Sequence, residues 1–351
     1  MKNSRWMRAL AVCMGVLALL IAGGYLYLRG FELDSQAKVN AQSQVTDLAF
    51  VRDGVREKRG RILAVLTSTP MIGDSGKKAG FELTELSRAY LVFLANGYEV
   101  DIASPLGGEP PMRKDDGLID ADHAFLNDAE AMHKVNHSLP LAGIRAADYA
   151  AVYFVGGKGT MFDFPDNPHI QQIVREVYES GGVIGAVCHG PAGLLNVRLG
   201  DGSLLIAGRQ LTGFSNAEEL FLIEDAREVF PFLLEDRLQE RGATYREGAL
   251  YLDNTIVDGR LVTGQNPWST WSVAESMIRA LGHEPVVREA TAEENSVALL
   301  QTFHAKGSDA ALRERAQAAH LDRGLLLMHA LVAGMQWRLA DAFVMQRLAR
   351  P

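Results

Sequence analysis

A cysteine followed directly by a histidine is the pair of side chains in this sequence best suited to chemistry. Cys188 and His189 stand at the end of the apolar run 183–187, and Gly190 comes next. A buried strand that passes through small residues into a helix has the layout of a nucleophile elbow. The helix N-terminus is expected to stabilise a thiolate and to lower the pKa of the Cys188 thiol. We therefore predict that Cys188 is a nucleophile, although a core cysteine at a strand end is the alternative.

A thiolate that attacks a carbonyl group needs hydrogen-bond donors for the oxyanion that develops. Gly156 and Gly157 follow the apolar run 149–155, which is predicted to be the neighbouring strand. Their backbone N–H groups, together with that of His189, are the candidate donors. A simple strand-to-loop turn would have the same sequence, so the two glycines alone do not establish this role.

Strand and helix patterns alternate through the middle of the chain. Short β-branched apolar runs indicate buried strands, and apolar residues at helical spacing indicate helices. The predicted strands are 61–67, 98–103, 149–155, 183–187 and 260–264, and the predicted helices are 80–96, 120–135, 168–180, 232–241 and 267–281, with another helix starting at His189. This alternation predicts an α/β domain with a mostly parallel, doubly wound sheet and helices on both faces.

The N-terminal segment predicts a membrane anchor. Ala9 to Leu28 is an uncharged run of 20 residues, which as a helix would cross a hydrocarbon core of about 30 Å. Three cations precede the run and Arg29 follows it. This imbalance favours a cytoplasmic N-terminus and a soluble domain on the periplasmic side of a bacterial-type inner membrane. A cleaved signal peptide is the alternative.

These patterns divide the chain into four parts. They are a membrane anchor (1–30), a polar stalk (31–58), the α/β catalytic domain (59–285) and a C-terminal helical extension (286–351). The apolar stretch Gly324 to Met335 in the extension is too short to span a bilayer. It is expected to pack on the domain, on a partner subunit or on the membrane surface.

Composition and spacing argue against several other classes of protein. A net charge of −8 over 351 residues gives no basic field for nucleic acid. Cys13 and Cys188 lie in different predicted parts, so no disulfide framework is expected. His133 and His137 have a metal-binding spacing, but no third ligand is identifiable and a solvated face is favoured. No Gly-Lys-Ser/Thr follows Gly156, so no phosphate loop is predicted. We predict neither a metal nor a cofactor.

Six ordered blocks between residues 61 and 281 resemble the PfpI/ThiJ superfamily. Within it they are most similar to the heat-shock-protein-31-like glutathione-independent glyoxalases. The blocks are Gly80–Glu85, Gly97–Pro105, Gly156–Pro165, Ala186–Pro191, Leu211–Glu219 and Gly259–Pro267. The resemblance implies a flavodoxin-like fold, shared with class I glutamine amidotransferases. The N-terminal segment and the tail after about residue 285 lie outside it.

The resemblance implies catalytic roles for four residues. Cys188 matches the nucleophile and His189 the residue beside it. Glu219 matches the carboxylate that pairs with the histidine, and the adjacent Glu218 is the alternative. Glu85 matches an acid on the first helix whose carboxyl group contacts the sulfur. A carboxyl group beside a thiolate in a dry pocket is expected to have a raised pKa, so that it can donate a proton and take it back.

The predicted function is that of a cofactor-independent glyoxalase, a lyase of the D-lactate dehydratase type. Cys188 would form a hemithioacetal with a small 2-oxoaldehyde such as methylglyoxal. The product released would be a 2-hydroxy acid. The alternatives are a cysteine-dependent amidase, peptidase or deglycase, and a holding chaperone or redox stress protein. Lys158 stands where the family often has histidine, and Trp268 where a small residue is usual, so the substrate stays open. The superfamily often dimerises, so a homodimer is one expectation.

Overall fold

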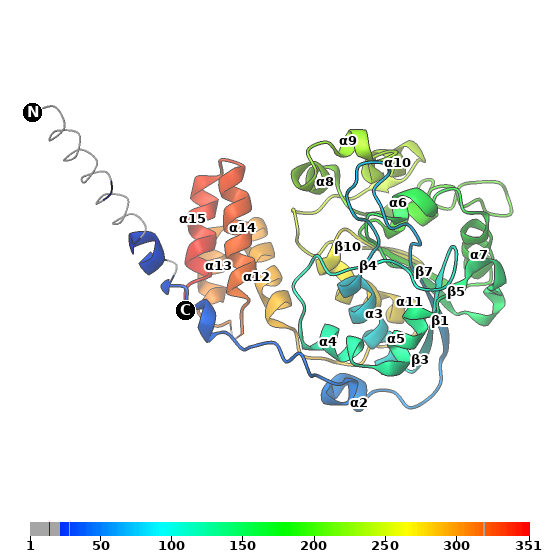
Figure 1. Cartoon of the computed structure of the whole chain (residues 1–351), viewed down its shortest axis with the longest axis horizontal. Coiled ribbons are helices and arrows are strands. Elements are labelled where there is room, and N and C mark those ends of the chain that lie inside the picture. The colour runs from blue at the N-terminus through cyan, green and yellow to red at the C-terminus, as the bar shows by residue number, and fades with distance from the viewer. Residues whose placement is uncertain (1–13, 15–21, 28, 319) are drawn as a thin grey trace, which may run out of the picture. The chain divides into compact units, whose positions relative to one another are not determined.

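The computed structural model describes residue 14 and residues 22–27, 29–318 and 320–351 (Figure 1). Its contacts divide the chain into two compact units. One unit is Val39–Glu289, and the other combines Met1–Lys38 with Ala290–Pro351. The four predicted domain limits remain predictions. The larger unit contains all of the predicted catalytic domain, 59–285, and also residues from the predicted stalk.

The larger unit is built on a sheet which, in the described residues, has seven strands in the order β10-β11-β7-β6-β1-β3-β5. The strands are β1 (Gly60–Val65), β3 (Tyr98–Ser104), β5 (Leu139–Pro140), β6 (Ala151–Phe154), β7 (Val183–Val187), β10 (Thr255–Asp258) and β11 (Leu261–Gly264). Neighbouring strands pair in parallel, except for the antiparallel pair β10 and β11. The predicted α/β domain with a mostly parallel sheet is therefore confirmed.

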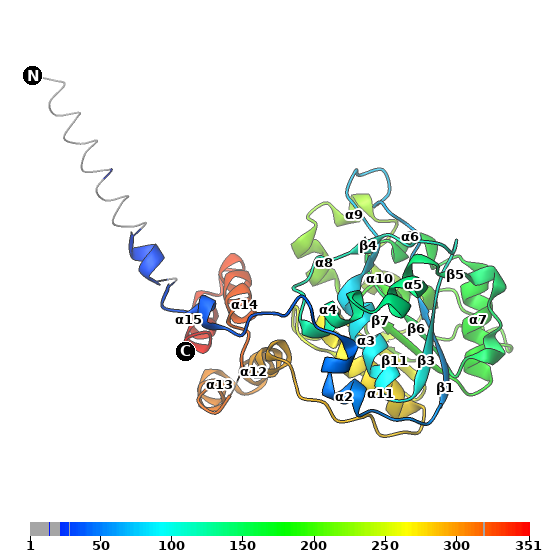
Figure 2. The same ribbon diagram turned by 60° about the horizontal axis from the view of Figure 1, so that its bottom comes forward.

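Helices cover both faces of this sheet (Figures 1 and 2). The helices are α2 (Ala49–Arg52), α3 (Leu83–Ala95), α4 (Asp120–Leu126), α5 (Ala129–Asn136), α6 (Thr160–Asp163), α7 (Pro168–Glu179), α8 (Asn216–Leu222), α9 (Ala226–Val229), α10 (Leu234–Glu240) and α11 (Thr270–Ala280). The crossovers β1-α3-β3 and β6-α7-β7 run in opposite directions across the sheet. Because such crossovers are right-handed, α3 and α7 lie on opposite faces. Helix α11 packs beside α3.

Two predicted helices differ from the structure for local reasons. The expected helix 120–135 is divided into α4 and α5, because the side chain of Asp128 accepts hydrogen bonds from the N–H groups of Glu130 and Ala131 and so starts a new helix. The helix expected after His189 is a 3-10 helix, η5 (Gly190–Leu194), with Pro191 in its first turn. Proline has no N–H to donate, so it removes a helical hydrogen bond everywhere except in the first turn, where N–H groups have no partner within the helix.

The predicted membrane anchor is corrected by the structure. Among the described residues, no helix is both long and apolar enough to cross a bilayer. The described helical run in this region covers residues 22–27, whereas a span requires about 20 residues. The rest of the run Ala9 to Leu28 lies outside the described residues except for Met14, and Cys13 also lies outside them. The predicted inner-membrane location and periplasmic orientation depended on this anchor and are likewise not supported.

The smaller unit brings the chain before residue 39 together with the C-terminal helices. Its helices are η1 (Leu33–Ser35), α12 (Ala292–Lys306), α13 (Ser308–Arg315), α14 (Arg323–Met335) and α15 (Leu339–Leu348). Phe31 is buried, and the guanidinium group of Arg323 donates to its carbonyl oxygen at 3.1 Å. The apolar stretch Gly324 to Met335 forms most of α14, which packs against α15 in the same unit (Figure 1).

Part of the predicted stalk packs within the larger unit. Helix α2 contacts α3, and the side-chain amide of Asn127 donates to the carbonyl oxygens of Ala41 and Ser43 at 2.9 Å each. Residues 41–52 therefore lie against the helical layer on the α3 face, and are not an extended spacer.

Helix α11 packs closely on β7, the strand that leads to Cys188. Every residue of β7 is buried. A Cβ atom added at Gly185 would overlap the sulfur of Met277 on α11. The absence of a side chain at Gly185 therefore sets the depth at which α11 packs.

We predict that Gly185→Ala lowers the free energy of unfolding by about 1–3 kcal/mol, because the added methyl group forces Met277 out of its place. Urea denaturation measures the change. Gly143→Ala is the matched control, since a Cβ atom there has no neighbour within 4 Å. In a Met277→Ala background the overlap is removed. Gly185→Ala should therefore lower the free energy of unfolding by less in that background than in the wild type. Equal stability of Gly185→Ala and the wild type would contradict this packing.

Candidate active site

Cys188 lies on a strained turn at the carboxyl end of β7. Its φ is 57°, in the left-handed region, which costs a residue with a side chain on the order of 1–2 kcal/mol. Hydrogen bonds hold the turn on two sides. The N–H of Cys188 donates to Gly264 at 2.9 Å, and its carbonyl oxygen accepts from Phe214 at 2.8 Å. The backbone thus has the elbow geometry that the sequence predicted.

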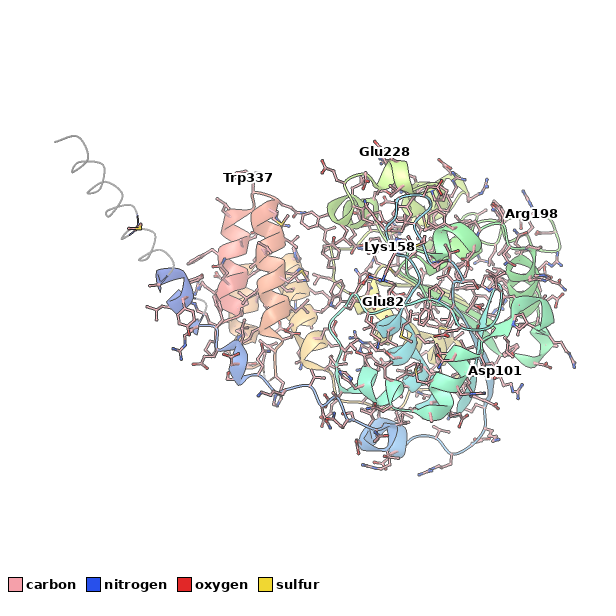
Figure 3. The ribbon with its side chains drawn as sticks, viewed as in Figure 1. Glu82, Asp101, Lys158, Arg198, Glu228 and Trp337 are labelled. Atoms are coloured by element: carbon pink, nitrogen blue, oxygen red, sulfur yellow. The ribbon has the colours of Figure 1, made fainter. Side chains whose placement is uncertain are left out.

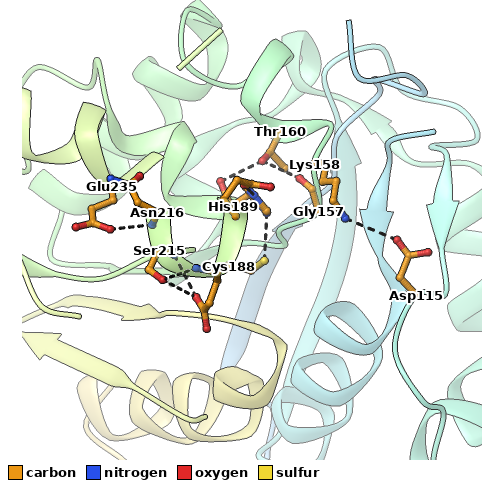
Figure 4. A network of polar contacts seen from close by, with 12 residues as sticks. Asp115, Gly157, Lys158, Thr160, Cys188, His189, Ser215, Asn216 and Glu235 are labelled. Carbon is orange, nitrogen blue, oxygen red and sulfur yellow. Dashed lines mark hydrogen bonds and ion pairs between the residues drawn. The ribbon is translucent and has the colours of Figure 1, made fainter. Parts of the chain in front are cut away.

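A histidine and a carboxylate form a chain that starts at the sulfur. The Nδ1 atom of His189 lies 3.2 Å from the sulfur of Cys188 (Figure 4). The Nε2 atom of His189 lies 2.5 Å from Oε2 of Glu219, which comes from α8. When Nε2 donates its hydrogen to the carboxylate, the lone pair of Nδ1 faces the sulfur. The ring also packs against Phe214, with centroids 4.6 Å apart.

Glu85 brings a second carboxyl group to the sulfur from the first turn of α3. Its side chain is fully buried, hydrogen-bonds to the Cys188 thiol, and accepts the N–H of Gly156 at 2.7 Å. Burial raises the pKa of Glu85 well above its usual value, and the negative charges of Glu82 and Asp116 raise it further. Glu85 is therefore held as a neutral acid, which can donate its proton to the sulfur.

The Cys188 thiol does not have the lowered pKa expected from a helix N-terminus. Burial raises the pKa of the thiol well above its usual value, and the Glu85 carboxylate adds to this effect, while Lys158 opposes it. The five-residue η5 is short, and its dipole does not outweigh the loss of water. The Glu85 carboxylate raises the pKa of the thiol, whereas the hydrogen bond from the thiol lowers the pKa of Glu85, so the two groups titrate as a pair. A thiolate forms most readily while the proton remains on Glu85.

The candidate oxyanion donors are not equivalent in the structure. The N–H of Gly156 is already bonded to Glu85. In the described part of the chain, the N–H groups of Gly157 and His189 have no protein acceptor. These two groups are therefore free to bind an oxyanion, and Gly156 serves instead to hold the acid.

The structure distinguishes between the two adjacent glutamates of α8. Glu218 accepts hydrogen bonds from the N–H groups of Ser215 at 3.1 Å and Tyr251 at 2.8 Å, and from the side chain of Asn266 at 2.9 Å. It therefore caps its helix and fixes the chain around it. Glu219 is the one that reaches His189.

An acidic cluster beside Glu85 was missed by the sequence analysis. Glu82 lies in β2 (Phe81–Glu82), which pairs with β4 (Met112–Arg113). Its carboxylate accepts the N–H of Asp115 at 3.2 Å, and burial raises the pKa of Glu82 to about 8. Lys158 lies 3.9 Å from Asp115 and faces this cluster (Figures 3 and 4). The spacing of Glu82 and Glu85 could have indicated a shared face, but nothing in the sequence placed Asp115 beside them.

His133 and His137, which have a metal-binding spacing in the sequence, lie side by side without a third ligand among the described residues. The rings of His133 and His137 stack with centroids 4.2 Å apart. Among the described residues, no group of three or more histidine, cysteine or carboxylate side chains is placed to hold a metal ion.

Comparison with known proteins places this site in a family. Residues 77–280 match the model of the DJ-1/PfpI family. Glyoxalase 3 of Candida albicans is 35% identical over 235 residues, which cover 63% of this chain and 98% of that protein. A glutathione-independent glyoxalase of Saccharomyces cerevisiae is 34% identical over 235 residues, with the same coverage of 63% and 98%.

Solved structures of similar proteins include a glyoxalase as well. The crystal structure of glyoxalase III from Candida albicans aligns with a TM-score of 0.57 at 31% identity, covering 63% of this chain and 97% of that one. The Rapid Encystment Protein 24 KDa of Francisella tularensis aligns with a TM-score of 0.60 at 35% identity, covering 63% and 99%.

The raised pKa of Glu82 predicts a pH-dependent stability. A carboxyl group whose pKa rises on folding stabilises the protein below its ordinary pKa of 4.5, and this contribution is lost as the pH rises to about 8. Glu82→Gln removes the titration. Between these pH values, the free energy of unfolding should fall by about 5 kcal/mol less in the variant than in the wild type. Urea denaturation across the range checks this, with the exposed Glu109→Gln as control. Equal losses in wild type and Glu82→Gln would contradict the assignment.

Gly156→Ala should separate the acid from the sulfur. A Cβ atom there would lie 2.6 Å from Oε2 of Glu85 and 2.8 Å from Cβ of Cys188. The displaced carboxyl group would no longer hydrogen-bond the sulfur. We expect the rate at which a thiol reagent modifies Cys188 to change at least several-fold, while Gly143→Ala leaves it unchanged. An unaltered rate and pH profile in Gly156→Ala would show that Glu85 does not control the thiol.

Proposed function

The chain belongs to the DJ-1/PfpI family, and from this premise we propose that it is a cofactor-independent glyoxalase. It converts 2-oxoaldehydes of the methylglyoxal type to 2-hydroxy acids. The observation that carries the proposal is the position of the Cys188 sulfur between the imidazole of His189 and the neutral carboxyl group of Glu85. The relatives named as glyoxalases support it, since this chain covers 98% of their length.

The first step is addition of the sulfur to the aldehyde carbon. His189 Nδ1 takes the thiol proton, and the imidazolium that forms is stabilised by Glu219 on Nε2. The C–S bond forms as the carbonyl π bond breaks, and the electron pair moves to the aldehyde oxygen. The free N–H groups of Gly157 and His189 are available to this oxyanion. Protonation of the oxyanion gives a hemithioacetal.

The second step moves hydrogen from one substrate carbon to the next. A base removes the proton from the former aldehyde carbon to give an enediol, and a proton is returned to the neighbouring carbon. The product is a thioester of a 2-hydroxy acid, so one carbon is oxidised and the other is reduced without an external electron carrier. Glu85 has the raised pKa required of a group that gives a proton and takes one back.

The last step is hydrolysis of the thioester. Water adds to the thioester carbonyl, the C–S bond breaks, and the 2-hydroxy acid leaves with the thiol restored. His189, held by Glu219, is the base closest to the sulfur. No glutathione is consumed, because Cys188 supplies the sulfur. A homodimer remains a prediction.

One observation also favours a second candidate, a cysteine-dependent hydrolase. Cys188, His189 and Glu219 form a nucleophile, a base and an orienting carboxylate, which is the arrangement of a thiol hydrolase. Glu85 distinguishes the two functions. A hydrolase of this kind does not require a second buried acid at the sulfur, whereas proton transfer between two carbons does.

We predict that the purified full chain forms lactate from methylglyoxal without glutathione. Cys188→Ser should abolish this turnover. Glu85→Gln should lower kcat by on the order of 10²–10⁴-fold, the usual contribution of a general acid or base, while Cys188 still reacts with a thiol reagent. The exposed Glu224→Gln is the matched control for loss of a carboxylate.

Lactate release measured by an enzyme-coupled assay decides between the candidates. Turnover that survives in Cys188→Ser would refute the glyoxalase proposal. Hydrolysis of amide or ester substrates that is unaffected by Glu85→Gln, without activity on dicarbonyls, would instead support the hydrolase.

A further inference from the structure

A polar groove away from Cys188 has features that the proposed reaction does not use. It is a cavity of about 640 Å³ in the larger unit, lined by residues of α7, by Arg241 at the end of α10, and by the loops that follow α6 and η5. The lining residues are Asp166, Pro168, Gln171, Gln172, Arg175, Asn196, Arg198, Leu204 and Arg241. Its volume is within the range of small-molecule sites. Cys188, His189, Glu85 and Glu219 are not among its lining residues.

Three guanidinium groups line this groove without a carboxylate partner. Within the described chain, Arg175, Arg198 and Arg241 form no ion pair, although Arg198 donates to the carbonyl oxygen of Gly202 at 2.7 Å. The Nε atom of Arg241 is buried and has no hydrogen-bond partner. A buried donor without an acceptor is costly. An anion bound in the groove would give this donor an acceptor.

The carboxylates near the groove are few and already engaged. Asp166 is the acid in its lining, and it accepts the side-chain amide of Asn196 at 2.8 Å. On the same helix as Arg175, Glu176 accepts from Gln172 at 2.8 Å, and Glu179 accepts the N–H of Gly200 at 2.5 Å. The lining thus has three positive charges against one negative charge, in a chain whose net charge is −8. Arg198 lies on the α7 side of this unit (Figure 3).

A second cavity shares lining residues with the groove and differs from it in character. This cavity, of about 310 Å³, shares Asp166, Asn196 and Arg241 with the first. Its other lining residues are mostly apolar: Met161, Phe162, Pro165, Leu195, Pro231 and Phe232, with Arg237 beside them. The guanidinium group of Arg237 lies 4.8 Å from the ring centroid of Phe232 and pairs with Glu240 at 2.9 Å. The two cavities together offer a cationic end and an aromatic end.

We propose that this groove is a second binding site, which takes a phosphomonoester with an aromatic body, as in a mononucleotide. Arg175, Arg198 and Arg241 hold the phosphate group, because guanidinium groups match its oxygens with paired hydrogen bonds. The amides of Gln171 and Asn196 supply further donors. The aromatic body lies toward Phe162 and Phe232. The site does not depend on the reaction at Cys188.

Titration calorimetry on the full chain tests the proposal with three probes: adenosine monophosphate, inorganic phosphate and adenosine. We expect adenosine monophosphate to bind, inorganic phosphate to bind more weakly, and adenosine to show no binding. Affinity for adenosine monophosphate should fall as the salt concentration rises, because the attraction is between charges.

Single substitutions localise the binding. Arg175→Gln and Arg198→Gln should each weaken adenosine monophosphate binding by about tenfold, the effect of losing one charged hydrogen-bonding group. Both side chains reach solvent, so the variants should fold. Arg56→Gln, an exposed arginine elsewhere on the same unit, is the matched control.

Three results would overturn the proposal. They are absence of adenosine monophosphate binding, equal binding to the wild type and both groove variants, and equal binding of adenosine. Equal affinities for inorganic phosphate and adenosine monophosphate would contradict the role given to the aromatic end.

Discussion

The structure of the active site depends on one proton that a buried carboxyl group and a buried thiol share. Glu85 and Cys188 hydrogen-bond to each other where almost no water reaches, and burial raises the pKa of both. Two negative charges cannot coexist at this distance in a dry site, so the pair keeps at least one proton at neutral pH. When that proton lies on Glu85, the sulfur is ionised and hydrogen-bonded. His189 then accepts the proton that leaves the thiol, and Glu219 fixes the orientation of the His189 ring.

The fold brings these groups together at one edge of a parallel sheet. Cys188 follows β7, Gly156 follows the next strand β6, and Glu85 begins the helix that leads away from β1 on the far side of β6. Carboxyl ends of parallel strands meet at one edge, which is where such sheets bind ligands. The strained φ of Cys188 is maintained by hydrogen bonds to Gly264 and Phe214. A side chain at Gly156 would overlap the carboxyl group of Glu85, and one at Gly185 would overlap Met277 on α11.

Much of this arrangement could be predicted from the sequence, and the failures have physical causes. Apolar periodicity located the strands, and the order of Cys188, His189 and Gly190 predicted the elbow. Local pattern does not measure burial, so the pKa of Cys188 was predicted in the wrong direction. The cluster around Glu82 depends on a loop that has no periodicity, and the groove arginines come from three segments far apart in the sequence. The membrane anchor was predicted from the length of an uncharged apolar run and its flanking charges, and the described helices do not support it.

The neutral state of Glu85 is the central claim, and infrared spectroscopy tests it most directly. A protonated carboxylic acid has a carbonyl band distinct from that of a carboxylate. At neutral pH, the difference spectrum between the wild type and Glu85→Gln should contain this band. The band should persist when the comparison is made in a Glu82→Gln background, which removes a neighbouring carboxyl group with a raised pKa. A difference spectrum with only carboxylate bands would mean that Glu85 is ionised, and the shared proton would not exist.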